Sequence, residues 1–197
     1  MNKAIVILSA VILTAAQSIQ SMDALHTTLK ITSPGIYTLH DDIVFGSDTG
    51  YILGPDSLVL KPQPSDMGIE INSDDVTLNL NTRAITTTDK LCMLPLRAVT
   101  IKSGKKYIVV CNGAIQNFAN GSGVFIEPSN RLDSFFDKKT HITLQNIVFR
   151  NVHKPLALHA ALNVLLKDIM APCGTSFAAH HEFAGLAFCN VRYFAKS

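Results

Sequence analysis

The sequence lacks several patterns that would each indicate a particular class of protein. It has no tryptophan and four tyrosines, a small supply of the exposed rings that sugar-binding grooves usually present. No basic stripe interleaved with aromatic residues is visible, which argues against nucleic acid as a partner. The cysteines have no CxxC spacing, so a zinc knuckle or a thioredoxin-like site is not expected. They are Cys92, Cys111, Cys173 and Cys189.

The N-terminus has the pattern of an export signal. Lys3 gives a short positive region, residues 4–16 are mostly apolar, and small residues suit cleavage near Ser18. The apolar run is too short for a typical membrane span, and no later segment reaches that length. We therefore predict a signal peptide over residues 1–18 and a secreted, periplasmic or cell-envelope protein, with an uncleaved N-terminal anchor as the alternative. Disulfides are permitted in such a compartment, although the favoured interpretation is that the cysteines are small buried residues or form a single staple in a loop.

A six-residue apolar motif recurs at a fixed step in the second half of the chain. Residues 144–149 (LQNIVF) recur at 166–171 (LKDIMA) and at 188–193 (FCNVRY), and the steps from 144 to 166 and from 166 to 188 both equal 22. A fixed period in this range is typical of stacked repeat architectures, in which each unit buries its apolar face against its neighbours. The second half is therefore predicted to be a repeat structure.

Two earlier copies of the motif have longer spacings. The step from residue 110 to residue 144 is 34, and the step from Leu78 to Val110 is 32. Relative to a step of 22, the first surplus is 12 and fits the polar segment 128–139, and the second is 10 and fits the segment 82–95. Repeat proteins tolerate such insertions as loops because the stacked elements stay in register.

Local patterns predict that the repeated elements are strands. Residues 69–71 and 76–80 alternate between apolar and polar side chains, as a strand with one buried face does. Short β-branched or aromatic runs predict further strands at 107–110, 124–126 and 142–144. The alanine-rich residues 156–166 could form a helix on propensity, but their alignment with residues 178–188 at the same step of 22 favours a strand.

Short strands, tight bends and this period together predict an all-β fold, a right-handed parallel β-helix. Each turn would take about 22 residues, and some turns would carry inserted loops. We place the β-helix domain at residues 30–197 and a lead-in at 19–29. The chain ends just after a predicted strand, so we expect a covered C-terminal end, end-to-end self-association, or a chain that is a fragment of a longer solenoid.

Two segments resemble a known family. Residues 33–39 (SPGIYTL), followed by 41–43 (DDI), look like the opening turn of the pectin-lyase-like right-handed β-helix proteins. Residues 73–81 (SDDVTLNLN) are similar to a frequent turn of that superfamily, in which a buried strand ends at an asparagine-containing bend. The resemblance covers about residues 30–193 and implies the fold. It implies no single activity, since the superfamily includes lyases, hydrolases, epimerases and adhesins.

The catalytic motifs of the enzymes in this superfamily are not found in the sequence. Lyases that resemble pectate lyases carry a Trp-x-Asp-His element and an Arg-x-Pro-x-x-Arg element. This chain has no tryptophan, and residues 150–155 (RNVHKP) do not match the second element. Polygalacturonase-like hydrolases carry Asn-Thr-Asp and Gly-His-Gly, whereas here Asn81-Thr82 is followed by Arg83 and Gly-His-Gly does not occur. The comparison favours a protein that is not an enzyme.

Two pairs of aspartates precede predicted strands. Asp74 and Asp75 are catalytic candidates, and together with Asp41 and Asp42 they could supply hard oxygen ligands to calcium. The alternative is that these carboxylates accept backbone N–H groups at bends, and this alternative is favoured. No cofactor is predicted beyond that calcium option.

Histidines give the pattern that looks most like a functional site. The step from His159 to His181 is again 22, which predicts that they lie one above the other and point outward, with His180 and Glu182 beside them. Two imidazoles at strand spacing could bind a metal or share a proton. His159, His181 and Glu182 are therefore metal-site candidates, and the two histidines are also catalytic candidates. No third ligand is evident, and stacked like residues are common in solenoids.

Equivalent bends of the repeat carry a polar residue directly before an apolar run. Side-chain amides at these positions can bond from one turn to the next, which predicts a structural ladder rather than a line of ligands. The positions are Asn112, Asn146, Asp168 and Asn190.

The sequence as a whole favours a binding or structural β-helix module that recognises a polysaccharide or a cell-surface glycan. The alternative is a carbohydrate-active enzyme, a polysaccharide lyase or glycoside hydrolase with an atypical site. We expect no nucleic-acid partner and no membrane span after removal of the signal.

Overall fold

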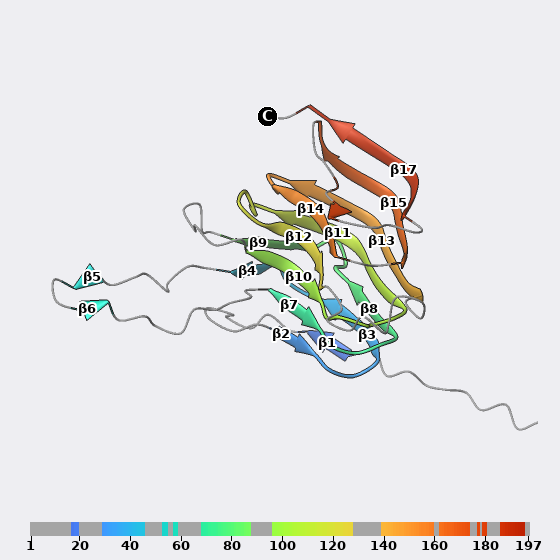
Figure 1. The fold of residues 1–197 in the computed structure, drawn as a ribbon, viewed down its shortest axis with the longest axis horizontal. Coiled ribbons are helices and arrows are strands. Elements are labelled where there is room, and N and C mark those ends of the chain that lie inside the picture. Colours follow the sequence, from blue (N-terminus) through green and yellow to red (C-terminus); the bar gives the residue numbers. More distant parts are fainter. Residues whose placement is uncertain are drawn as a thin grey trace, which may run out of the picture.

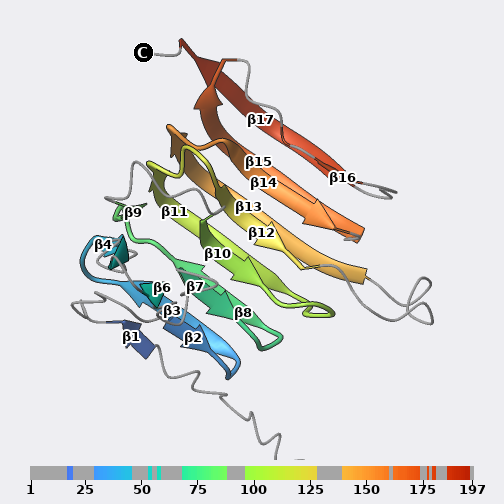
Figure 2. The same ribbon diagram turned by 60° about the vertical axis from the view of Figure 1, so that its left-hand side comes forward.

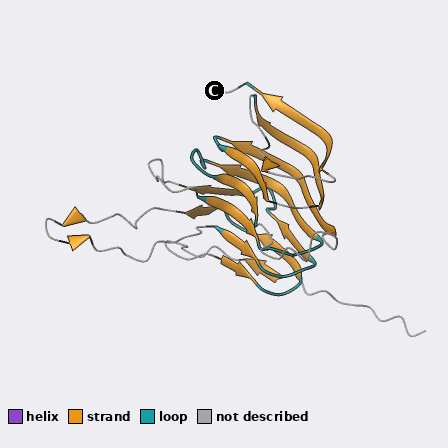
Figure 3. Cartoon of the chain, in the orientation of Figure 1, coloured by secondary structure: helices purple, strands orange, loops and turns teal. Residues whose placement is uncertain are grey.

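The computed structural model describes residues 17–19, 29–45, 53–54, 57–58, 68–87, 96–127, 139–159, 162–173, 177, 179–180 and 186–195. These residues form strands and turns and include no helix (Figure 3). Accordingly, the described part of the chain offers no helix with the length and apolar character to cross a membrane. The predicted all-β class is confirmed.

Nine strands form one sheet, called sheet A, in which every neighbouring pair is parallel. Its main path runs β1-β3-β8-β11-β13-β15-β17, with β9 paired to β11 and β4 paired to β9 (Figure 1). The strands are β1 Gln17–Ile19, β3 Gly35–Leu39, β4 Ile43–Phe45, β8 Val76–Asn79, β9 Ala84–Thr87, β11 Ile108–Gln116, β13 Lys139–Arg150, β15 Leu162–Pro172 and β17 Leu186–Phe194.

Six strands form a second parallel sheet, called sheet B, in the order β16-β14-β12-β10-β7-β2 (Figure 2). They are β2 Leu29–Ile31, β7 Ile69–Ile71, β10 Arg97–Ile101, β12 Ser122–Ile126, β14 Lys154–His159 and β16 Ala179–His180. A separate antiparallel pair joins β5 Leu53–Gly54 to β6 Ser57–Leu58.

From β7 onward the chain passes back and forth between the two sheets. β7 lies in sheet B, β8 and β9 in sheet A, β10 in sheet B and β11 in sheet A, and the alternation continues to β17. Each strand therefore pairs with the strand that occupies the same place one pass later. Parallel pairing requires such crossovers, because a tight hairpin can join only antiparallel strands.

The register of sheet A confirms the predicted spacings. Leu78 lies opposite Val110, and Val110 lies opposite Leu144. Leu144 lies opposite Leu166, and Leu166 opposite Phe188, as the repeated step of the motif predicted. The alanine-rich residues 156–166 belong to β14 and β15 where they are described, so the strand prediction is correct there and the helix alternative is wrong.

The paired positions also show where most of the 12 extra residues between positions 110 and 144 are inserted. Sixteen positions separate Ile126 from Ile142, whereas six separate the equivalent Leu158 from Val164. Ten extra residues therefore fall between β12 and β13, where the sequence predicted an inserted loop. Residues 128–138 themselves lie outside the described part of the chain.

One hydrophobic core joins the two sheets. Alternate residues of the sheet A strands point into it, as Val76 and Leu78 of β8 and Ile142 and Leu144 of β13 do, each with no exposed surface. Sheet B contributes Ile69, Ile71, Val99, Ile101, Val124, Ile126, Leu156 and Leu158 to the same cluster. Burial of this continuous apolar column is the main source of stability.

Sheet B departs from the predicted one-sided burial. All three residues of β7 are buried, including Glu70, and all five residues of β12 are buried. Glu70 is tolerated because its carboxylate oxygens lie 3.7 Å from Nζ of Lys30 and 3.8 Å from Nζ of Lys102. The apolar–polar–apolar pattern of residues 69–71 therefore reflects a buried ion-paired residue rather than a solvent-facing side.

Two strands begin at positions that bear on the sequence predictions. β11 begins at Ile108, one residue after the predicted start at Tyr107, which has a left-handed φ of 59°. β1 includes Gln17 and Ser18, at the position predicted for signal cleavage, and pairs with β3. Residues 1–16 and 20–28 lie outside the described part, so the signal peptide and the lead-in stay predictions.

Candidate functional site at the leading column of sheet A

Residues with a left-handed backbone conformation (positive φ) recur at three places along the sheet A strands. The first set lies inside the long strands, at Asn112, Asn146, Asp168 and Asn190, with φ between 53° and 61°. Asn112 Nδ2 donates to Asn79 Oδ1 at 3.2 Å, and Asn146 Nδ2 donates to Asn112 Oδ1 at 3.2 Å. Asn190 Nδ2 donates to Asp168 Oδ1 at 2.6 Å. The predicted turn-to-turn ladder is confirmed for these pairs.

A second set lies just past the ends of β11 and β13, at Asn117 and Asn151, and the sequence reasoning missed it. Their φ values are 67° and 51°. Asn117 Nδ2 donates to Thr86 Oγ1 at 3.0 Å, and Asn151 Nδ2 donates to Asn117 Oδ1 at 3.4 Å. The step from Asn117 to Asn151 is 34, the same as from Asn112 to Asn146, so a search at that spacing would have found them.

The third set lies just before β8 and β11 and near the start of β13 and β15. It consists of Asp75, Tyr107, His141 and Asn163, called here the leading column, with φ of 54°, 59°, 46° and 59°. The positions are equivalent because Val76, Ile108, Ile142 and Val164, one residue later in each case, pair in register. Two backbone groups of this column bond to the next pass of the chain, because Asp75 N–H donates to Lys106 O and Tyr107 N–H donates to Thr140 O.

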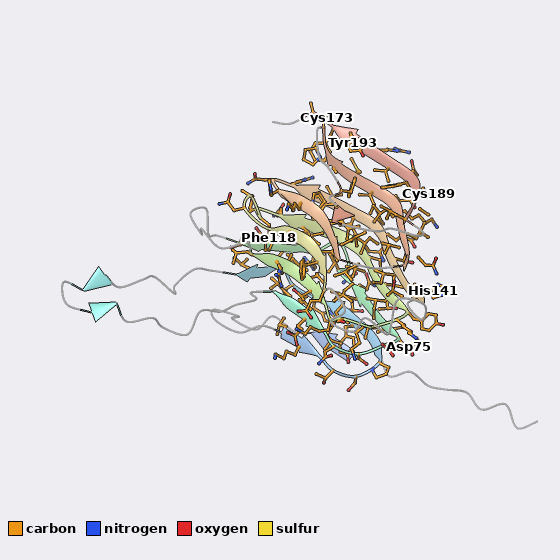
Figure 4. All side chains as sticks on the ribbon, viewed as in Figure 1. Asp75, Phe118, His141, Cys173, Cys189 and Tyr193 are labelled. Carbon is orange, nitrogen blue, oxygen red and sulfur yellow. The ribbon has the colours of Figure 1, made fainter. Side chains whose placement is uncertain are left out.

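The side chains of the leading column differ from those of the two ladders. Tyr107 is 55% exposed, and Asp75, His141 and Asn163 are also exposed. The rings of Tyr107 and His141 stack, with centroids 5.2 Å apart and planes 6° apart. Within the described part of the chain these four side chains make no hydrogen bond or ion pair. Figure 4 places His141 and Asp75 at the same edge of the molecule.

Tyr107 is the conformational outlier of the column. Asn, Asp and His are enriched in the left-handed region because their side chains tolerate it, whereas a bulky residue there is unusual. The left-handed conformation costs a residue with a Cβ roughly 1–2 kcal/mol. At Tyr107 the cost is offset neither by burial nor by a hydrogen bond of the hydroxyl within the described structure.

Of the aspartates predicted as site candidates, two accept backbone N–H groups and Asp75 makes no hydrogen bond within the described residues. Asp74 Oδ1 accepts the N–H of Lys106 at 3.0 Å, and Asp42 Oδ1 likewise accepts the N–H of Ala84 at 2.8 Å. Each carboxylate therefore satisfies a backbone donor one pass later, which confirms that these two aspartates act at bends. Asp75 keeps its carboxylate unengaged in the leading column, as far as the described residues go.

The predicted histidine pair has a different partner from the one expected. His159 in β14 lies opposite His180 in β16, not His181, because Leu158 pairs with Ala179 and the step in sheet B is therefore 21 here. The alignment between His159 and His181 at a step of 22 is wrong for this strand pair. The side chains of His159 and His180 are not described, and His181 and Glu182 lie outside the described residues.

No calcium or transition-metal site is assembled by the described side chains, among which no group of three His, Cys, Asp or Glu residues gathers. Cys111 is buried, Cys173 and Cys189 are exposed, and all three are free thiols. Burial raises the pKa of the Cys111 thiol. Cys92 lies outside the described residues.

The leading column presents polar and aromatic side chains along the starts of the sheet A strands. It offers a carboxylate, a phenol, an imidazole and an amide, in this order, at successive strand spacings of about 4.8 Å. Lys105 and Lys106 precede Tyr107, and their ammonium groups make no ion pair in the described part of the chain. No family model, no curated protein and no solved structure matches the chain.

Proposed function

We propose that the chain is a right-handed parallel β-helix of the pectin-lyase-like kind and works as a binding or structural module. It is secreted or held in the cell envelope and recognises a polysaccharide or a cell-surface glycan. The superfamily, the handedness, the location and the ligand class are all parts of this proposal.

Three observations support the β-helix. The chain alternates between two parallel sheets. Paired positions in sheet A are 32, then 34, then 22 residues apart in the sequence. Asparagine side chains bond from one pass of the chain to the next. A chain wound continuously around one core produces this pattern, and the shared hydrophobic cluster fits it. The right hand follows from the strong preference of parallel crossovers for that hand.

The observation that carries the binding function is the leading column. Its side chains are polar or aromatic, exposed, and make no hydrogen bond or ion pair within the described part of the chain, and the rings of Tyr107 and His141 stack. Side chains of the two ladders are hydrogen-bonded from pass to pass. Glycan hydroxyl groups need hydrogen-bond donors and acceptors. A tyrosine side chain can also contact the apolar face of a sugar ring while its hydroxyl stays hydrated. Asp75, Tyr107 and His141 supply both.

The enzyme alternative gains no support from the described residues. Asp74, one of its candidates, has an oxygen committed to the N–H of Lys106. Hydrolysis with inversion needs two carboxyl groups about 6.5–9.5 Å apart, one to protonate the leaving group and one to activate water. Of the candidate pair, Asp74 has one oxygen bonded in this way and Asp75 has no hydrogen bond within the described residues, so the turnover assay below decides between binding and catalysis.

A panel of soluble polysaccharides and immobilised glycans tests the proposal. We expect the purified chain to bind at least one glycan and to leave it intact. Intact ligand means no unsaturated product absorbing in the ultraviolet, as a lyase would release, and no new reducing ends, as a hydrolase would release. Binding is measured by glycan array and confirmed by calorimetry.

Two results would contradict the proposed function in different ways. Turnover of any bound glycan would replace the binding module with an enzyme. Absence of binding across neutral, acidic and sulfated glycans would leave the glycan proposal without support, whatever the fold.

A further inference from the structure

We propose that the free edge of β17 pairs with the same edge of a second copy of this chain. The two strands run antiparallel about a two-fold axis, and each copy covers the open end of the other's core. This contact is separate from the leading column and does not depend on the proposed function. It reduces the end-to-end association expected from the sequence to one pair of strands, one direction and one register.

The hydrophobic core is open at β17. Phe188 and Tyr193 are 54% and 52% exposed, whereas their partners in β15, Leu166 and Ala171, have no exposed surface. Phe177 packs against both rings, with centroid distances of 6.1 Å and 6.5 Å, and still leaves them exposed to this extent. Four positions of β17 pair with buried residues of β15 and therefore point inward: Leu186, Phe188, Val191 and Tyr193. All four are apolar or aromatic, as in a strand that is covered on both sides.

β17 also has a backbone edge without a described partner. One edge pairs with β15, and none of the described strands pairs with the other, which lies at the end of the stack (Figure 2). Natural edge strands are kept from pairing by short length, proline, lysine or inward-pointing charge. β17 is nine residues long and contains no proline or lysine, and its one charged residue, Arg192, pairs with the outward Met170. Its backbone is therefore suited to accept another strand.

A second copy fits this edge because the inward positions of β17 are symmetric about its middle. Asn190, with a φ of 54°, interrupts the alternation of the strand, so two inward positions precede it and two follow it. Directly opposite residues of antiparallel strands point to the same face of the sheet. Reversal of the strand about the point between Cys189 and Asn190 therefore places inward residues opposite inward residues. The resulting pairs are Leu186 with Tyr193 and Phe188 with Val191 and, on the outer face, Ala187 with Arg192.

The other end of the stack matches β17 less well. Its outermost described strands, β1 and β2, have three residues each, whereas β17 has nine. Head-to-tail contact with that end would leave most of the β17 edge unpaired, and its repetition would give open filaments instead of a closed dimer. Two-fold pairing matches nine residues with nine and closes after two copies. The length of β17 thus favours a second β17 as the occupant.

The end face has the size of a small specific interface. Nine strand residues span about 30 Å, and two sheets about 10 Å apart, with their outer side chains, are roughly 20 Å wide. About 600 Å² per partner would be buried, which is at the lower limit of the roughly 600–1,000 Å² found in specific complexes. We therefore expect a dimer that dissociates on dilution, with a Kd on the order of micromolar.

Sedimentation velocity over about 1–200 μM protein measures this association. We expect a shift from monomer to dimer with rising concentration and no larger species. Tyr193→Lys adds a charge at an inward position of the open end and should raise the Kd of the dimer about tenfold or more. Val44→Lys is the matched control, because Val44 is 47% exposed but lies in β4, and it should leave the Kd unchanged. Circular dichroism checks that both variants are folded.

Cysteine cross-linking tests the register without adding a charge to the core. In a Cys173→Ser/Cys189→Ser background, the double variant Ala187→Cys/Arg192→Cys is treated with oxidised glutathione. Directly opposite Cα atoms of antiparallel strands are about 4.5–5.5 Å apart, within the range of about 4.4–6.8 Å that a disulfide spans. We expect a disulfide-linked dimer on a non-reducing gel. Each single cysteine variant should give far less, because neither position lies opposite itself.

Three results would contradict the proposal. A chain that stays monomeric at the highest concentration would leave the β17 edge to a different partner, and assemblies larger than a dimer would indicate head-to-tail contact. A dimer that Tyr193→Lys does not weaken would place the contact elsewhere on the molecule. In the cross-linking experiment, single variants that link as well as the double variant would exclude the register given above.

Discussion

Replacing Leu144 with alanine should lower the free energy of unfolding by about 2–5 kcal/mol. Leu144 has no exposed surface and lies in register between Val110 and Leu166, so a cavity would open between two passes of the chain. The surrounding side chains come from a shared core that can close only partly around the gap. Urea denaturation followed by circular dichroism measures the change.

Phe188→Ala is the matched control for the Leu144 prediction. Phe188 occupies the same register position in β17 but is 54% exposed, so its truncation opens no closed cavity and should cost less than about 2 kcal/mol. A loss as large as that of Leu144→Ala would mean that Phe188 is covered in solution. End-to-end self-association, predicted from the sequence, would produce that result in a concentration-dependent way.

Asn112→Ala should destabilise the chain by about 2 kcal/mol. The substitution removes the bonds of Asn112 to Asn79 and to Asn146, which contribute about 0.5–1 kcal/mol each at a partly exposed site. It also places alanine at a φ of 61°, a conformation that asparagine tolerates better. Urea denaturation measures this change as well.

Two companion variants separate these contributions. Asn112→Gly loses the same bonds but accepts the left-handed conformation, so it should lose about 1 kcal/mol less than Asn112→Ala. Gln145→Ala, on a neighbouring outward position, should change stability by no more than about 0.5 kcal/mol. Equal losses in Asn112→Ala and Asn112→Gly would show that the backbone conformation contributes nothing.

The apolar spacing made the register of sheet A predictable. Leu78, Val110, Leu144 and Leu166 must all reach one core, so their positions in the sequence determine which residues pair. The asparagine ladder was predictable for the same reason, because Asn112 and Asn146 stand next to core residues. The extra residues between successive strands did not alter the register of sheet A, because the strands on either side of them remain paired.

Sheet B and the leading column could not be predicted in the same way. The step between β14 and β16 is 21 instead of 22, and this change by one moves the partner of His159 from His181 to His180. The left-handed φ of Tyr107 follows from its equivalence to Asp75 and Asn163, and tyrosine gives no local signal for it. The burial of Glu70 depends on lysines from two other passes.

The site and the fold are linked through the same repetition. Regular pairing holds the equivalent bends at strand spacing, which places Asp75, Tyr107, His141 and Asn163 in one line. The ladders use that spacing for internal bonds. The leading column, by the proposal made above, uses it to present side chains to a ligand.

Nuclear magnetic resonance titration of the wild-type chain with the best glycan of the panel tests this account most directly. The largest shift changes should fall on Tyr107 and His141, with smaller ones on Asp75, Asn163 and the neighbouring lysines, and they should saturate at the affinity measured by calorimetry. Changes confined to other residues, such as the outward positions of β17, would contradict the assignment of the leading column as the binding site.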